Sequence, residues 1–244
     1  MTAVPLPDLD EVVLRPVRGH HAFEACVEQL ATAIRLGVFP LGTMLPSERE
    51  LAERLEVSRA TLREAMAALR AAGLVETRRG RGGGTVVTMK PQGPSARTVG
   101  TTTAAQRADW LDALHFRRIV EPGAAALAAS RALDDRARAT VEAAHRAVAR
   151  ATSRARHRQA DSRFHLTIAS MSGSPRVVEA VTSVQASLHE MLSAIPVLQT
   201  NITHSDNQHA ALVRAVLDGR PDRARQTMEE HCDDTAALLR GLLG

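Results

Sequence analysis

The sequence predicts a mainly α-helical chain in two parts: three helices with a small β-hairpin, followed by an all-α antiparallel bundle. Three observations support this fold class. Alanine and leucine, which are strong helix formers, dominate an apolar fraction of 44% in which aromatic residues are only 2% of the chain. Helical periodicity recurs through most of the sequence, whereas β-prone runs occur in one short region. Residues 90–106 are rich in Pro, Gly, Ser and Thr, which predicts a linker between the two parts.

The N-terminal part is expected to fold over residues 20–89, after a flexible arm at residues 1–19. Its first helix is predicted over residues 20–36, where apolar residues recur on one side. The turn Phe39-Pro40-Leu41-Gly42 follows this helix.

Two serines mark the starts of the next two helices. Ser47 and Glu50 have the S-x-x-E spacing of a capping box, so a helix is predicted from there to about Leu55. Ser58 is the expected N-cap of the following helix, which should stop at Gly73. The two helices are separated by only a couple of residues, as a helix-turn-helix requires.

A small hairpin is expected after these helices. Residues 74–77 and 85–88 are short β-prone stretches, and the segment between them carries several arginines and glycines. Glycines at the hairpin tip would let the backbone approach a ligand closely. Three helices followed by a hairpin are the element order of a winged helix-turn-helix, in which the hairpin is the wing.

The C-terminal part, residues 107–244, is predicted to be helical almost throughout. Breaks are expected at residues 172–175, around Pro196 and at residues 219–221, where Gly, Ser and Pro interrupt the pattern. The repeated helix-break pattern predicts an antiparallel bundle of helices.

Charge and cysteine content set the class of partner and compartment. The net charge is +4, and Lys90 is the only lysine, so almost all the positive charge is arginine. This balance permits a nucleic-acid partner, although a GC-rich genome produces the same bias. Cys26 and Cys232 are far apart, so a reducing compartment is expected rather than a disulfide framework. The sequence has neither a signal peptide nor a membrane-spanning stretch, so a cytoplasmic protein is predicted.

The second helix of the pair is the expected recognition helix. In a helix-turn-helix, the N-terminal residues of that helix meet base edges in the major groove. Here these residues are Ser58, Arg59, Thr61 and Arg63. Arginine suits a bidentate bond to guanine, while Ser and Thr can bond phosphates or bases. Arg54, by contrast, is expected to be an ordinary solvated charge.

The run LPSERELAERLEVSRATLREAM, within residues 31–88, resembles the N-terminal domain of the GntR family of bacterial regulators. The spacing inside this run agrees with the family throughout. The resemblance implies that the chain binds a double-stranded operator. The contact residues that it implies are Arg49, Arg59, Arg63 and Gly80, with Ser58, Thr61 and Arg79 beside them.

A possible metal site stands out in the helical part. Asp161 and His165 are four residues apart on a predicted helix and therefore share one face. His209 and His231 each lie about ten residues from the break at 219–221, so in a helical hairpin both sit roughly 15 Å from the turn. Three imidazoles and a carboxylate suit Zn²⁺, Ni²⁺ or a similar divalent ion. A chance grouping fits as well, because the chain has ten histidines.

Three further stretches, FRRIVEPGAAALAA, DSRFHLTIASMSGSP and QHAALVRAVLDGRPDRARQTMEEH, resemble the FCD ligand-binding domain of the FadR-type branch. The resemblance implies a metal held by Asp161, His165, His209 and His231 at the bottom of a cavity, beside a carboxylate effector. One departure is Ser174, where many members have Asn.

An arginine is expected to anchor that effector, since its planar fork matches a carboxylate. Arg117 is the candidate by resemblance and Arg118 is the alternative, because the two cannot point in the same direction. Glu121 is expected to pair with a neighbouring arginine in a structural role.

Together these features predict a homodimeric transcription regulator, a repressor, that binds an inverted-repeat operator and responds to a small carboxylate near a divalent metal. The alternative is a direct metal sensor in which the ion is the signal. An enzyme is disfavoured, because no general base such as the Glu of H-E-x-x-H stands beside the candidate ligands. An architectural DNA-binding protein without an effector is the remaining alternative.

Overall fold

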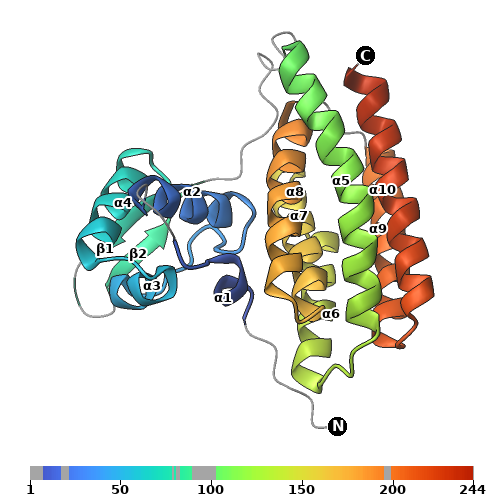
Figure 1. The fold of residues 1–244 in the computed structure, drawn as a ribbon, viewed down its shortest axis with the longest axis horizontal. Helices are drawn as coiled ribbons and strands as arrows, with labels where there is room; N and C mark the ends of the chain where they lie inside the picture. Colours follow the sequence, from blue (N-terminus) through green and yellow to red (C-terminus); the bar gives the residue numbers. More distant parts are fainter. Residues whose placement is uncertain are drawn as a thin grey trace. The chain divides into compact units, whose positions relative to one another are not determined.

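The computed structural model describes residues 8–17, 22–78, 80, 83–89, 103–194 and 199–243. The chain divides into two compact units, one over Asp8–Pro91 and the other with most of its length in Gln92–Gly244. Figure 1 labels the helices and strands of each unit. None of the described helices is long and apolar enough to cross a membrane.

The first unit has the predicted winged helix-turn-helix order. Helices α2 and α4 pack against each other, α3 packs on α4, and a two-stranded antiparallel sheet follows. The bounds are α1 Leu9–Val13, α2 Ala22–Arg35, α3 Glu48–Leu55, α4 Arg59–Ala71, β1 Val75–Arg78 and β2 Gly84–Val87. Its interior is aliphatic, as the scarcity of aromatic residues requires, and includes Leu30, Ile34, Leu51, Leu62 and Met66.

Hydrogen bonds from serine hydroxyls begin α3 and α4, as the sequence predicts. Ser47 Oγ accepts a bond from the Glu50 backbone N–H at 3.2 Å, and Ser58 Oγ accepts one from the Thr61 N–H at 3.0 Å. The Glu50 carboxylate, expected to close a capping box, instead accepts a hydrogen bond from Arg54 at 2.7 Å. The helix starts are therefore set by local chemistry, whereas the glutamate is drawn to a stronger donor.

The prediction of a flexible arm over residues 1–19 is wrong for residues 8–17. Residues Leu9–Val13 form α1, and Val12 and Val13 are buried. The segment joins the first unit through backbone bonds, including one from the Val17 N–H to the Leu55 carbonyl at 2.8 Å. A five-residue helix is too short to show a periodic pattern, so it could not be recognised from the sequence. The rest of the predicted arm lies outside the described residues.

The same helix corrects the expectation for Arg54. Its side chain is only 21% exposed, and its guanidinium is 2.7 Å from both Asp10 of α1 and Glu50 of α3. Burial alone would lower the pKa of Arg54, but these two carboxylates raise it above its usual value. Arg54 therefore links α1 to the helix-turn-helix instead of standing free in solvent.

The second unit is the predicted bundle of helices. Helix α5 lies against α10, α8 and α7, while α6 packs on α7 and α9 on α10 (Figure 1). The bounds are α5 Ala104–Ala129, α6 Asp135–Ala149, α7 Arg154–Met171, α8 Pro175–Ala194, α9 Gln199–Leu217 and α10 Pro221–Leu243.

The helix breaks in this unit agree with the sequence where they are described. Gly173 and Gly219 have φ of +70° and +66°, so each ends a helix in a left-handed turn that glycine adopts without strain. The break expected at Pro196 lies outside the described residues. The predicted linker ends slightly earlier than expected, because Thr103 caps α5 by accepting a bond from the Gln106 N–H at 3.1 Å.

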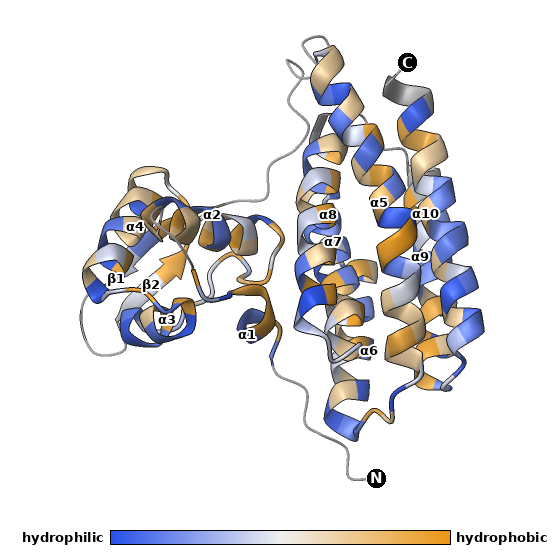
Figure 2. Ribbon diagram, in the orientation of Figure 1, coloured by the Kyte–Doolittle hydropathy of each residue, from blue (hydrophilic) through white to orange (hydrophobic). Residues whose placement is uncertain are grey.

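The bundle interior is built mainly from small and aliphatic side chains. One cluster surrounds Phe164 and Ile168, with alanines of α5 and valines of α6 and α9. A second cluster surrounds Trp110, which is 2% exposed. Figure 2 shows apolar and polar residues interspersed along each helix, which is the pattern of amphipathic helices that share a core.

Candidate functional site

The candidate recognition helix presents an exposed, positively charged start. Arg59 and Arg63 are both exposed and stand one turn apart on α4. Ser58 caps the helix, and its hydroxyl also lies 2.8 Å from that of Thr61. Both hydroxyls are therefore engaged within the helix start, whereas the two arginines project from it.

Arg49 occupies a similar exposed position on α3. Its Nη1 lies 2.8 Å from Glu53 Oε1, and the two side chains are 63% and 62% exposed. An exposed pair of this kind contributes little to stability, because water competes for both charges. Arg49 can therefore exchange Glu53 for a phosphate at small cost.

The wing carries the other predicted contact residues. Gly80 is exposed and has φ of +103°, a left-handed conformation that favours glycine, and its carbonyl accepts a bond from the Gly83 N–H at 2.9 Å. Arg78, at the end of β1, lies 2.8 Å from Glu76. Arg79, named as a contact from the sequence, lies outside the described residues.

In the helical unit, three of the four predicted metal ligands come together. His165 of α7, His209 of α9 and His231 of α10 offer nitrogen atoms that all lie within 4.8 Å of one another. Their side chains are buried, and the ring centroids of His209 and His231 are 4.7 Å apart. The helical hairpin of α9 and α10 and the adjacent α7 thus bring together residues far apart in sequence.

Asp161 stands at the edge of this histidine cluster, outside the tight group of three. Its Oδ1 is 3.5 Å from His209 Nε2, and its side chain is 13% exposed. As one turn of helix separates it from His165, both side chains point to the same region. The carboxylate is therefore placed to join the three imidazoles around a cation.

The chemistry of the cluster fits a divalent cation. His165 Nε2 and both ring nitrogens of His209 are buried without a hydrogen-bond partner among the described residues. Leaving buried polar atoms unpaired is costly, so such atoms call for an explanation such as a bound ion. Burial, and then the nearby His165, lowers the pKa of His209 well below its usual value. Burial and His209 do the same for the pKa of His231, so both rings are neutral, as metal ligands must be.

A chain of hydrogen bonds orients His231 within the cluster. The Asp234 carboxylate accepts a bond from Gln208 Nε2 at 2.7 Å, so the Gln208 carbonyl Oε1 must face the other way. That oxygen lies 3.0 Å from His231 Nδ1, which is therefore the protonated nitrogen, and Nε2 keeps its lone pair. His204, which is 62% exposed, also contacts Asp234 at 2.8 Å. The role of Gln208 could not be predicted from the sequence, because it depends on contact between two helices.

Glu121 is the centre of a second group of buried polar contacts. Its Oε2 accepts a bond from Arg117 Nε at 3.1 Å, and its Oε1 accepts one from Gln185 at 2.6 Å. His165 Nδ1 lies 2.9 Å from the same carboxylate. Burial alone would raise the pKa of Glu121, but Arg117 and His165 hold it far below its usual value, so the group is ionised. The predicted pairing of Glu121 with an arginine is confirmed, and Cys232, whose pKa burial raises to about 12, remains a thiol beside it.

The structure also decides between the two arginines left open by the sequence. Arg118 is 39% exposed and pairs with Asp233 at 2.8 Å. Arg117 is 1% exposed, and its Nη1 is buried without a hydrogen-bond partner among the described residues. Because Arg117 faces the interior and Arg118 does not, Arg117 is the one of these two that is placed to anchor a ligand there.

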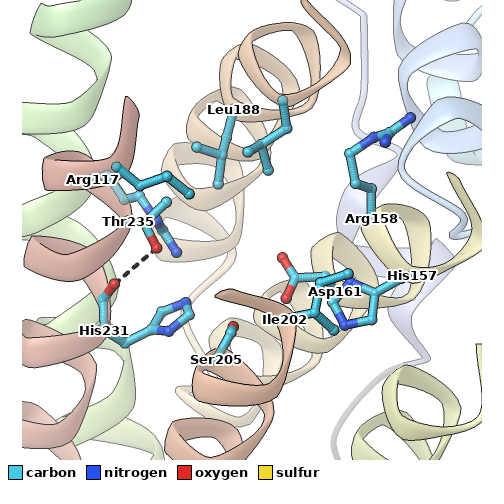
Figure 3. Close-up of a pocket in the computed structure, with 11 residues that line it drawn as sticks. Arg117, His157, Arg158, Asp161, Leu188, Ile202, Ser205, His231 and Thr235 are labelled. Atoms are coloured by element: carbon cyan, nitrogen blue, oxygen red, sulfur yellow. Dashed lines mark hydrogen bonds between the residues drawn. The ribbon is translucent and has the colours of Figure 1, made fainter. Parts of the chain in front are cut away.

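A cavity that is partly open to solvent lies beside these groups. Figure 3 shows Arg117, Thr235 and His231 around one part of it and Asp161 across the opening. Ser174, the departure from the family pattern, is not among the lining residues. Its hydroxyl instead accepts a bond from the Val177 N–H at 3.4 Å, near the start of α8.

Comparison with known proteins agrees with both units. Residues 23–87 match the family described as "Bacterial regulatory proteins, gntR family", and residues 112–234 match the FCD domain. A curated relative, "Putative HTH-type transcriptional regulator RmpR" of Mycobacterium gastri, is 34% identical over 94% of this chain and 84% of its own. "HTH-type transcriptional repressor NanR" of Klebsiella aerogenes is 30% identical over 93% of this chain and 89% of its own.

Solved structures show the same fold. The E. coli protein McbR/YncC aligns over 91% of this chain and 99% of its own, with a TM-score of 0.55 and 16% identity. A GntR regulator from Rhodococcus sp. RHA1 covers the same shares, with a TM-score of 0.50 and 22% identity. The relatives are regulators by name, which agrees with the prediction that the chain is not an enzyme. With a helix-turn-helix match, an FCD match and relatives that span nearly the whole sequence, this chain belongs to the GntR family of DNA-binding transcription regulators, in the branch that carries an FCD domain.

Proposed function

We propose that this regulator is a repressor whose operator affinity is set by a small carboxylate bound beside a divalent metal ion in the helical unit. One observation carries the proposal. The cavity is lined by Arg117, whose Nη1 is unpaired, and by His231, whose ring belongs to the same tight cluster as His165 and His209, which have unpaired buried nitrogens. Unpaired imidazole nitrogens call for a cation, and a buried guanidinium calls for an anion.

The metal would be held by His165, His209 and His231, with Asp161 as the oxygen ligand. This donor set of three imidazoles and a carboxylate suits Zn²⁺ or Ni²⁺. When bound, the ion supplies an electron-pair acceptor that can also take a carboxylate oxygen of the effector. Gln208 supports the site by fixing the tautomer of His231.

Arg117 is the second anchor for the effector. Its Nε is already bonded to Glu121, which holds the guanidinium in place, while Nη1 is left for a ligand. Burial strengthens such a charge-assisted bond, since little water competes for it. The Glu121 carboxylate therefore positions Arg117 as well as His165.

DNA recognition is assigned to the exposed surface of the first unit. Arg59 and Arg63 would read base edges, with Ser58 and Thr61 at the helix start beside them. Arg49 and the wing around Arg79 and Gly80 would contact the backbone and the adjacent groove. The relatives named as repressors support negative control of transcription.

A second copy of the chain would supply the second DNA-binding unit that an inverted-repeat operator requires. Helix α5 carries three large exposed apolar side chains, Phe116, Ile119 and Leu127, that are 44%, 73% and 49% exposed. Their spacing places them along one side of the helix, and a Cβ added at Gly123 between them would meet no atom within 4 Å. Such an open apolar stripe would be covered by the same helix of a partner chain in a two-fold dimer.

In this scheme the effector acts by linkage. It shifts operator affinity only by its own difference in affinity for the DNA-competent and DNA-incompetent states. The two linked sites are the effector cavity in the bundle and the DNA-recognition surface on α3, α4 and the wing.

The first test is elemental analysis of protein purified without chelators. We expect about one divalent ion per chain in the wild type, about none in the variant with His165→Ala and His209→Ala, and an unchanged value in His115→Ala, whose side chain is exposed. No metal in the wild type, even after reloading with Zn²⁺, Ni²⁺ or Mn²⁺, would contradict the metal site. Release of DNA by the metal alone, with no response to any carboxylate, would favour the direct metal sensor.

A further inference from the structure

The cavity beside the histidine cluster combines two kinds of lining. Its polar groups include Arg117, Asp161 and His231. Aliphatic side chains from three helices complete it: Leu188 and Leu192 of α8, Ile202 of α9 and Leu238 of α10. Figure 3 shows Leu188 and Arg117 facing the same opening. A ligand that fills this space must therefore present an anionic group to the arginine and an apolar surface to most of the remaining lining.

Most of the lining polar groups already have partners within the protein. His231 is bonded to Gln208, Thr235 donates to the His231 carbonyl at 2.9 Å, and His157 lies 3.2 Å from Asp206. Arg117 Nη1 is a buried donor with no hydrogen bond, so Arg117 gains from an anion bound in the cavity. The guanidinium of Arg117 can therefore bind one anionic group of the ligand.

The aliphatic lining disfavours a polyhydroxylated ligand. A hydroxyl group placed against Leu188, Leu192 or Leu238 would lose its hydrogen bonds to water and gain none in return. A methylene group in the same place would gain from leaving water. A second carboxylate placed against these leucines would also lose its hydration, at a larger cost because it is charged.

We propose that the effector is a monocarboxylate with an apolar body, in which the carboxylate lies toward Arg117 and the hydrocarbon lies against Leu188, Leu192, Ile202 and Leu238. This proposal rests on the proposed carboxylate-controlled function and narrows it to one ligand class. Sugar acids, with their many hydroxyls, and dicarboxylates are the classes that it excludes. Because Arg158 also lines the cavity and could bind a second carboxylate, a dicarboxylate is the main alternative.

The test is calorimetric binding of a homologous series to the full chain purified without chelators and reloaded with Zn²⁺. The probes are acetate, butanoate, hexanoate and octanoate, with gluconate, adipate and hexanamide for comparison. We expect the dissociation constant to fall about fourfold for each added methylene until the chain reaches solvent. Hexanamide should not bind measurably, because it offers no charge to Arg117.

A matched pair of variants distinguishes an effect on the cavity lining from a general effect on the stability of the fold. Leu192 and Leu111 are both partly buried residues packed against the cluster around Trp110, but only Leu192 lines the cavity. Leu192→Asn should remove most of the gain from hexanoate over acetate and leave acetate binding unchanged. Leu111→Asn should preserve the full dependence on chain length.

The outcomes distinguish the two levels of the proposal. If all carboxylates bind equally while hexanamide does not, the carboxylate-controlled function stands and the apolar body is wrong. If adipate or gluconate binds at least tenfold more tightly than hexanoate, the ligand class proposed here is also wrong. If no carboxylate binds, both the effector class and the carboxylate function fail.

Discussion

The two units of this regulator place their functional side chains in opposite environments. On the first unit, Arg49, Arg59 and Arg63 stand in solvent, and the ion pair of Arg49 with Glu53 is exposed on both sides. In the second unit, Arg117 and Glu121 are 1% and 2% exposed, and their pair is part of the bundle interior. A DNA-binding surface can exchange weak partners for phosphates, whereas a ligand cavity must hold its charges ready without water. An arginine–glutamate ion pair therefore affects the stability of the protein differently in the two units.

The largest expected effect tests this contrast directly. Glu121→Gln should destabilise the protein by about 3–5 kcal/mol, because it leaves the buried Arg117 charge without its partner. Glu53→Gln, which removes the exposed partner of Arg49, should leave stability unchanged within error. Urea unfolding followed by circular dichroism measures both. Equal effects in the two variants would mean that burial does not separate the two pairs as argued.

The second prediction concerns the exposed surface alone. The double variant Arg59→Ala with Arg63→Ala should lose at least about thirtyfold in operator affinity, since each well-made arginine–base contact contributes about 1–3 kcal/mol. Its thermal stability should not change, because both side chains are exposed. Fluorescence anisotropy at fixed salt, with an operator selected from a random duplex pool, gives the affinity.

Arg220→Ala is the control for charge loss, since Arg220 is 69% exposed in the turn between α9 and α10. It should retain operator binding. A comparable loss in this control would show that net charge, and not position on α4, sets the affinity of the double variant.

The contrast also explains how far the sequence could be interpreted. In the first unit the helix starts at Ser47 and Ser58 were predicted correctly, because capping depends on residues three positions apart. Helix α1 was missed because five residues show no period. Arg54 was expected in solvent because its carboxylate partner Asp10 is 44 positions away in the sequence.

In the second unit the sequence predicted which residues meet but not how they are held. Spacing along α7 and around the α9–α10 turn was compatible with a cluster of His165, His209 and His231, and the resemblance to the FCD domain selected the same three residues. The choice between Arg117 and Arg118 required the packing of α5, which no local pattern records. The roles of Gln208 and Gln185 were likewise invisible, because each depends on a contact between two different helices.

The last prediction tests whether such partners matter as much as the ligands themselves. Gln208→Leu removes the bond that fixes the His231 tautomer, and we expect metal affinity to fall by about 10-fold to 100-fold. Gln226→Leu, which removes an exposed glutamine bonded to Glu230 on α10, is the matched control and should bind metal like the wild type. Competition with a chromophoric chelator measures Zn²⁺ affinity without requiring DNA or an effector. An unchanged affinity in Gln208→Leu would show that the cluster orients His231 by packing alone, in which case the interior of the bundle depends less on its hydrogen bonds than the comparison with the exposed unit implies.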